Sequence, residues 1–298
     1  GTFSRAEGFP NGAVTTLNAG SRKIEASTFA SQWALLSYLG RASYKYSDKY
    51  IADLSFRADG SSRFGEDNRF AYFPALSVAW IVSNETFLES SNSISNLKLR
   101  GSIGLTGNQN IGDFTSKGLY ATGSNYIFNN VILPGTRPAT ISNENLKWES
   151  TLQYNGGIDL SLFDYKLNFT FDYYYKSTSD LLVNIDLPRS TGFQSGIQNL
   201  GEIVNWGYEF SLKSYILNQQ NLSWQVQFNA FTNRNEVIDI GGADKQIFAG
   251  EIPERGFSVI VQEGQPLGSF YGYESLGVDP ETGNLVFADM NGDDIIDE

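Results

Sequence analysis

The chain has 298 residues, with 21 Lys and Arg against 33 Asp and Glu, a net charge of −12, and neither histidine nor cysteine. The missing residue types exclude thiol nucleophiles, imidazole bases, disulfides and the usual zinc sites, and with them zinc hydrolases and Ser-His-Asp catalysis. An acidic surface also repels phosphate backbones, so we expect no nucleic-acid partner.

Period-two alternation of apolar and polar residues recurs along the chain and predicts strands. The alternating segments are, in chain order, 50–59, 97–106, 152–162, 165–175, 206–216 and 222–232. In the first of them, one face carries Tyr50, Ala52, Leu54 and Phe56, and the other carries Asp53, Ser55, Arg57 and Asp59. Runs of about ten residues suit strands that cross a bilayer at a tilt, whereas strands of soluble domains average about 5–6 residues.

Two further features favour a membrane barrel. Tight links at 47–48, 163–164 and 218–221 alternate with long polar stretches at 59–69, 107–150, 188–205 and from about 235 onward. Aromatic residues lie toward the ends of the apolar faces, where a girdle meets lipid headgroups: Tyr50, Trp80, Tyr165, Tyr173, Tyr175, Trp206, Tyr208 and Trp224. The predicted fold class is therefore all-β, a portion of an antiparallel transmembrane β-barrel with short periplasmic turns and long extracellular loops.

The alternative is a secreted β-sandwich, a carbohydrate-binding module with a calcium loop, because one-sided burial in a sandwich produces the same alternation. The two alternatives differ in the fate of one set of apolar residues. A sandwich buries them beneath a second sheet, whereas a barrel leaves them facing lipid. The set is Leu54, Phe56, Leu167, Phe169 and Phe171.

A collinear series of motifs adds a family resemblance. The chain carries, in order, LSYLGR (36–41), RADGSSRFG (57–65), FPALSVAW (73–80), TGNQNIG (106–112), LKWE (146–149), DYYYK (172–176), PLGSFYGY (266–273) and DMNGD (289–293). Across roughly residues 9–298, this series resembles the β-barrel of the SusC/RagA family of TonB-dependent outer-membrane transporters.

The resemblance implies an outer-membrane location in a Gram-negative bacterium, with lipid around the barrel. Members of the family have a plug and a TonB box before the barrel. Neither is recognisable here, so we expect residues 1–298 to be part of one TonB-dependent-receptor β-barrel domain, without the plug, the TonB box and the C-terminal strands. An open slice leaves two unpaired sheet edges, and we expect it to aggregate or stay unfolded by itself.

The same resemblance implies a function and partners. A SusC-like transporter imports oligosaccharides or peptides together with a SusD-like surface lipoprotein, and TonB supplies energy through the plug. We expect no enzyme activity and no cofactor other than a calcium ion, because paired carboxylates in long loops fix no distance between them.

The acidic tail is the candidate metal site. The oxygens of Asp289, Asn291, Asp293 and Asp297 match positions 1, 3, 5 and 9 of a calcium loop. Asp294 stands where such a loop has glycine, and position 12 lies past the printed sequence. Calcium binding and a solvated acidic hairpin loop therefore remain as alternatives.

Two groups of residues are candidates for contacts in the transport path. The loop aromatics Tyr126, Phe128, Phe193 and Tyr271 are positioned to stack on sugar rings or pack on peptide side chains, and ordinary loop packing is the alternative. Segment 59–65 either lines the lumen or touches the plug, or it is a glycine-stabilised strand connection whose charges stay in water. Arg57 and Asp59 share a face with Asp53, which predicts a ladder of lumen-side ion pairs worth about 0–1 kcal/mol each.

Overall fold

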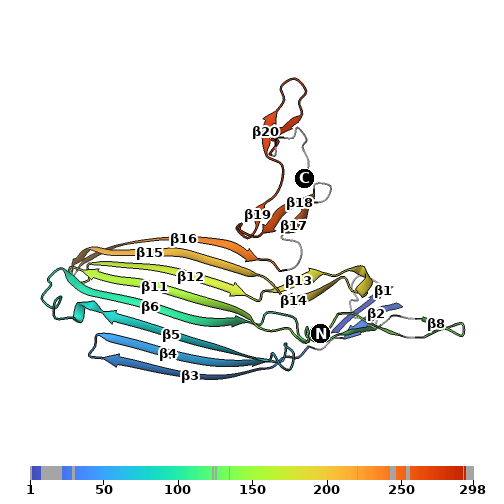
Figure 1. Cartoon of the computed structure of the whole chain (residues 1–298), viewed down its shortest axis with the longest axis horizontal. Coiled ribbons are helices and arrows are strands. Elements are labelled where there is room, and N and C mark those ends of the chain that lie inside the picture. The colour runs from blue at the N-terminus through green and yellow to red at the C-terminus, as the bar shows by residue number, and fades with distance from the viewer. Residues whose placement is uncertain are drawn as a thin grey trace.

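The computed structural model describes residues 2–7, 22–28, 31–122, 124, 126–133, 135–219, 221–241, 246–252, 256–290 and 292. One eight-stranded antiparallel sheet dominates it (Figure 1), with the strand order β16-β15-β12-β11-β6-β5-β4-β3. The strands are β3 (Leu35–Tyr46), β4 (Tyr50–Ser61), β5 (Phe70–Ile81), β6 (Ile94–Asn108), β11 (Glu149–Leu162), β12 (Leu167–Ser179), β15 (Glu202–Gln219) and β16 (Leu222–Asp239). They are longer than the alternating segments suggested, at 12 to 18 residues.

The sheet is an open meander. Each of its strands pairs with the next of the eight along the chain, and within the described residues β3 and β16 form its two edges. This arrangement confirms the predicted antiparallel all-β architecture. It is a curved slice of a barrel rather than a closed barrel.

Tight turns connect the strands at one end of the sheet, on the left of Figure 1. The predicted turns at 47–48 and 163–164 are present, and their residues adopt left-handed backbone angles, with φ between 50° and 56° at all four positions. Tyr165 continues the second turn with φ 62°, so the expectation that a strand begins at this residue was wrong. The same end holds the connection from β5 to β6, with the 3-10 helix η2 (Val82–Asn84).

Small hairpins occupy the opposite end, which we call the long-loop end (Figure 1). They are β1 (Thr2–Glu7) with β2 (Arg22–Thr28), β7 (Tyr120–Thr122) with β10 (Thr136–Pro138), β8 (Tyr126–Phe128) with β9 (Val131–Leu133), and β13 (Leu182–Asp186) with β14 (Ser195–Asn199). The 3-10 helix η3 (Arg189–Thr191) lies between β13 and β14. β17 (Gln246–Ile252), β18 (Gly256–Gln262) and β19 (Ser269–Phe270) form one small sheet, and β20 (Ser275–Val278) pairs with β21 (Leu285–Phe287).

The hairpin from residue 119 to residue 139 projects beyond the sheet, with β8 near its tip (Figure 1). Its base is closed by backbone hydrogen bonding, because the Ala139 N–H donates to the Leu119 carbonyl at 2.7 Å. The Leu119 N–H in turn donates to Thr140 Oγ1 at 2.9 Å. The long 107–150 stretch therefore has an ordered base and a protruding hairpin.

Register brings the alternating apolar residues of neighbouring strands into rows on one face of the sheet. Across the strands, Leu54 faces Leu76, which faces Ile103, and the same row continues through Tyr154, Tyr175 and Trp206. Leu54 and Phe56 are 56% and 49% exposed, and Leu167, Phe169 and Phe171 are half-buried among neighbours on their own face. No second sheet buries these five residues, so the sandwich alternative is wrong.

Aromatic rings gather on this apolar face near the tight-turn end. Tyr50 stacks between Tyr46 and Trp80, at 6.5 and 6.4 Å between ring centres. Tyr and Trp near the end of the strands match the aromatic girdle of a membrane barrel, where the apolar ring contacts lipid and the polar group contacts water and headgroups. Among the described residues, no helix is both long and apolar enough to cross a bilayer.

The main cluster of buried hydrophobic side chains is formed mostly by loop residues, with Phe73 of β5 as its member from the sheet. Phe64, Phe73, Ile111, Leu146 and Trp148 pack together at the long-loop end, and Leu146 is completely buried. The Trp148 ring contacts Phe64 at 5.2 Å and Phe73 at 5.6 Å, and its indole N–H donates to the Arg69 carbonyl at 2.9 Å. These contacts fix the loops after β4 and β6 to the end of the sheet.

Candidate functional site

The second face of the sheet is polar, and we call it the lumen face. One row across the strands illustrates its chemistry, running through Asp53, Ser77, Ser102, Asn155, Tyr174, Gly207 and Asn233. Amides, hydroxyls and charges thus alternate along each strand with the apolar residues of the opposite face. A sheet with one apolar and one hydrated face is what the wall of a water-filled membrane barrel requires.

Arg100 is the centre of the largest ion-pair network on this face. From β6 it reaches over β11 and donates two hydrogen bonds of 2.7 Å to Asp172 on β12. Two longer bonds of 3.1 Å go to Asp159 on β11, which also lies 3.8 Å from the Lys98 ammonium. The Arg100 and Asp172 side chains are only 28% and 14% exposed, so this pairing is shielded from water more than an ordinary surface pair.

A glycine makes that crossing possible. Gly157 lies between Arg100 and Asp172 in the register of β6, β11 and β12. A Cβ at this position would lie 2.4 Å from Asp172 Oδ1 and 2.8 Å from Arg100 Cζ, closer than atoms can approach. Only a residue without a side chain leaves room for the guanidinium.

The predicted ladder of ion pairs is present, with one change of partner. Arg57 Nε pairs with Asp59 at 2.6 Å, and the Asp59 carboxylate is only 7% exposed. Asp53 instead pairs with Arg41 of β3 at 2.9 Å, and it also accepts a hydrogen bond from the Ser43 hydroxyl. The partner on β3 could not be inferred from segment 50–59 alone.

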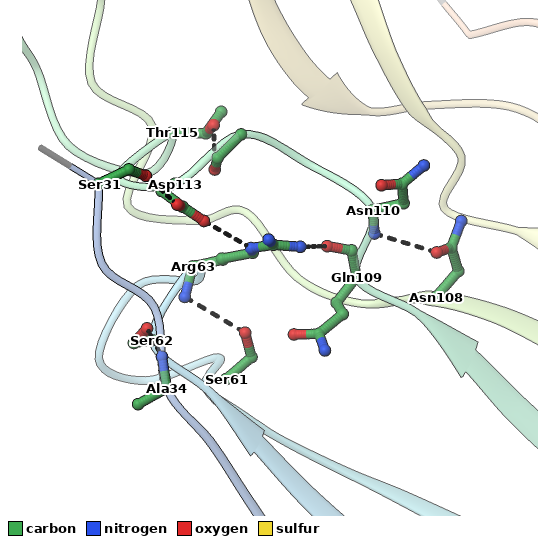
Figure 2. Close-up of polar contacts among 11 residues, drawn as sticks. Ser31, Ala34, Ser61, Ser62, Arg63, Asn108, Gln109, Asn110, Asp113 and Thr115 are labelled. Carbon is green, nitrogen blue, oxygen red and sulfur yellow. Dashed lines mark hydrogen bonds and ion pairs between the residues drawn. The ribbon is translucent and has the colours of Figure 1, made fainter. Parts of the chain in front are cut away.

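Arg63 ties three segments together at the long-loop end (Figure 2). Its Nε donates to Asp113 Oδ1 at 2.9 Å, an Nη donates to the Gln109 carbonyl at 3.2 Å, and the guanidinium lies 5.2 Å from the centre of the Trp33 ring. The Ser31 hydroxyl also donates to Asp113. The hydroxyl of Ser31, and then the guanidinium of Arg63, lower the pKa of Asp113.

These contacts exclude one of the two interpretations of segment 59–65. The Arg63 and Asp113 side chains are only 20% and 15% exposed, and Phe64 is 1% exposed. The segment is therefore part of the packed rim of the long-loop end, and the view that its charges simply stay in water was wrong.

Glu85 organises the tight-turn end. It accepts hydrogen bonds from the Lys49 ammonium at 2.9 Å, the Tyr50 hydroxyl at 2.7 Å and the Trp80 indole at 3.1 Å. These donors, the lysine first, lower the pKa of Glu85 to about 2. Asn84 beside it donates to the Asp48 carbonyl at 2.8 Å, so the connection from β5 to β6 is fastened to the turn between β3 and β4.

The four aromatics predicted to contact substrate lie on three different loops. Tyr126 and Phe128 are on β8 and are 54% and 67% exposed. Phe193 is half-buried between η3 and β14. Tyr271 packs edge-on against Phe248, at 5.0 Å between ring centres. The β8 pair therefore presents free ring surface, and the role of all four in binding stays a prediction.

The predicted calcium ligands lie mostly outside the described residues, which include Asp289 but not Asn291, Asp293 or Asp297. Asp289 Oδ1 accepts the Gly292 N–H at 2.7 Å, as in a tight turn. Within the described part of the chain, no group of three or more Asp or Glu residues is arranged to hold a metal ion. Calcium binding by the tail stays a prediction.

Sequence reasoning missed the Arg100 network and the Glu85 cluster. Period two places Lys98 and Arg100 on the polar face of one segment and Asp159 on that of another, but only the pairing of β6 with β11 brings them together. Glu85 lies in the connection after β5, where apolar and polar residues do not alternate. The one feature of the sequence that points to its role is its closeness to Trp80.

These features together define the wall of an outer-membrane β-barrel. Residues 2–289 match the family model described as TonB dependent receptor-like, beta-barrel. The chain belongs to this family, and its location is the outer membrane of a Gram-negative bacterium. The family is one of receptors rather than of enzymes.

Relatives narrow the similarity to the SusC/RagA type, as the motifs suggested. The TonB-dependent receptor P3 of Formosa agariphila is 35% identical over 98% of this chain and 31% of that receptor. SusC of Bacteroides thetaiotaomicron is 36% identical over 92% of this chain and 28% of its own length. The solved RagAB peptide transporter superposes with a TM-score of 0.84 at 30% identity, over 94% of this chain and 30% of that one. The chain thus spans less than a third of these relatives.

Proposed function

We propose that the whole protein is a TonB-dependent nutrient transporter that imports oligosaccharides or peptides with the help of a SusD-like surface lipoprotein. The observation that carries the proposal is the two-faced sheet, apolar outside and lined inside by ordered ion pairs, amides and hydroxyls. Such a wall encloses a hydrated path. In this scheme TonB supplies the energy for import through a plug. Residues 1–298 are part of one barrel domain and contribute its wall and its rim.

The long-loop end is the proposed place of substrate capture and of contact with the lipoprotein. The rim is held by the buried core around Leu146 and by the Arg63 contacts, so the loops start from fixed positions. From this base the β8 hairpin exposes Tyr126 and Phe128, whose rings offer apolar faces to sugar or peptide groups. The similarity to the solved RagAB peptide transporter supports peptides as a cargo, and oligosaccharides are the second class that the resemblance of the motifs implies.

Uptake in cells tests the proposal. The gene of the full-length protein is deleted, and growth is measured on oligosaccharides or peptides as the sole carbon source, with and without TonB. We expect growth on one of the two cargo classes to require both the transporter and TonB. Growth on every cargo without the transporter would contradict the proposal.

A matched pair of variants then tests the loop aromatics. Tyr126→Ser with Phe128→Ser removes one face of the hairpin, and we expect slower uptake of the cargo that the transporter requires. Ile127→Ser is the control, because Ile127 is 75% exposed but lies on the opposite face of the same strand. Equal effects of the two changes would show that these aromatics are not a binding surface.

A further inference from the structure

A row of register partners crosses the lumen face from β6 to β16. Its members, in order, are Arg100, Gly157, Asp172, Glu209 and Phe231. In the first half of the row, Arg100 and Asp172 are joined by two hydrogen bonds, so both charges have a partner. The second half ends with a carboxylate beside an aromatic ring, and this pair plays no part in the contacts described so far.

Glu209 is exposed and has no ion pair or side-chain hydrogen bond within the described part of the chain. Four aspartates face the lumen from the same sheet, and each of them is held by an arginine: Asp53, Asp59, Asp159 and Asp172. Glu149, at the rim end of β11, instead accepts hydrogen bonds from the Asn108 amide and the Leu182 N–H. The cluster around Arg100 contains two cations and, with Glu209, three carboxylates. One negative charge is therefore left over, and its position is Glu209.

Phe231 lies directly across from Glu209 on β16 and is 80% exposed. The two side chains line a pocket of about 260 Å³ together with Thr170, Ser211 and Asn229. A ring face beside an unpaired carboxylate attracts a cation that has an apolar stem, because the ring quadrupole and the carboxylate both favour positive charge. The hydroxyls and the amide supply further hydrogen-bond acceptors around it.

We propose that this pocket binds an ammonium or guanidinium group of the cargo on its way through the barrel. This inference rests on the proposed transport function and adds a charge preference to it. The surplus negative charge repels anionic cargo, and a neutral cargo gains nothing from it. A lysine or arginine side chain combines the required charge with an apolar stem that covers the Phe231 ring.

The absence of cysteine from the chain offers a direct test. Ser211→Cys, in a full-length protein freed of any other cysteine, places a thiol in the pocket two residues from Glu209. Its labelling rates with a cationic and an anionic methanethiosulfonate of equal size are compared at low salt. One unit charge at this separation favours the cationic reagent by on the order of five- to tenfold.

The matched variant is Glu209→Gln, which keeps the shape and removes the charge. We expect the rate ratio to fall toward one at Ser211→Cys, and to stay unchanged at Ser102→Cys, a control position on the lumen face of β6. A tetra-arginine peptide should slow the labelling of Ser211→Cys more than tetra-alanine does, and Phe231→Leu should weaken this protection. Retained heat-modifiability confirms that each variant is folded.

Three results would overturn the inference. Equal rates for the two reagents would show that no surplus charge acts in the pocket, and a ratio insensitive to Glu209→Gln would place that charge elsewhere. A thiol that neither reagent reaches would mean that another segment of the protein fills the pocket. These readouts do not require transport, so a failed uptake assay with a positive labelling result would refute the proposed function and leave the pocket standing.

Discussion

Gly157 offers the sharpest test of how the lumen face is built. In Gly157→Ala the new methyl group would lie 2.4 Å from Asp172 Oδ1 and 2.8 Å from Arg100 Cζ, so the guanidinium has to leave. Neighbouring Gly156 points to the other face, where a Cβ would meet no described atom within 4 Å. Both positions lack positive φ, so alanine is compatible with the backbone at each.

The expected cost follows from the contacts that are lost. Hydrogen bonds to charged groups contribute about 1.5–3 kcal/mol when they are shielded, and exposed ion pairs about 0–1 kcal/mol. Arg100 and Asp172 are 28% and 14% exposed, between these limits. We expect Gly157→Ala to lower the free energy of unfolding by about 1–3 kcal/mol, while Gly156→Ala leaves it within about 0.5 kcal/mol of the wild-type value.

The assay is denaturant unfolding of the full-length protein in detergent, followed by tryptophan fluorescence. A double-mutant cycle with Arg100→Ala identifies the mechanism, because without the arginine the Asp172 carboxylate is no longer held and can rotate away from the methyl group, so the cost of Gly157→Ala should largely disappear. Equal destabilisation by Gly156→Ala and Gly157→Ala, or costs that simply add in the cycle, would refute the reasoning.

Four further predictions concern other parts of the molecule. The folded-state pKa of Glu85, about 2, lies below its ordinary value of 4.5, so its contribution to stability is complete above pH 4.5 and is lost as the pH falls toward 2; between these values the wild-type protein should lose more stability in denaturant unfolding than Glu85→Gln does. Leu146→Ala should open the rim to limited proteolysis at a cost of about 2–5 kcal/mol, whereas Leu119→Ala, at a 42% exposed position, should not. Residues 1–298 alone should aggregate in detergent, and a monodisperse, heat-modifiable band would show otherwise. Calcium titration calorimetry of the full-length protein should give a binding signal that Asp289→Ala abolishes, and an unchanged signal in the variant would remove the tail as the site.

The strands and their two faces were predictable because alternation is a local property of the sequence. Each segment shows by itself which residues share a face, and left-handed turns such as the one after Tyr46 interrupt the pattern visibly. Strand ends were less accurate. β15 begins at Glu202, inside the stretch expected to be a loop, because the adjacent apolar residues Ile203 and Val204 break the period-two alternation there.

The networks were not predictable for a different reason. The partners Arg100 and Asp172 are separated by 72 residues and meet only through the pairing of three strands. The rim core has the same origin, since Phe64 and Trp148 lie in loops whose apolar residues follow no period. Which residues meet across strands depends on register, and register is a property of the assembled sheet rather than of any one segment.

The closed base of the 119–139 hairpin has a consequence for how such a rim can diversify. Because Leu119 and Ala139 are joined by a backbone hydrogen bond, the ends of the hairpin stay together whatever lies between them. Lengthening the tip changes only the entropy of loop closure, and doubling its length costs only about 0.6 kcal/mol. The sequence and length of the tip can therefore change, and with them the exposed surface, while the contacts of the buried core beneath it stay the same.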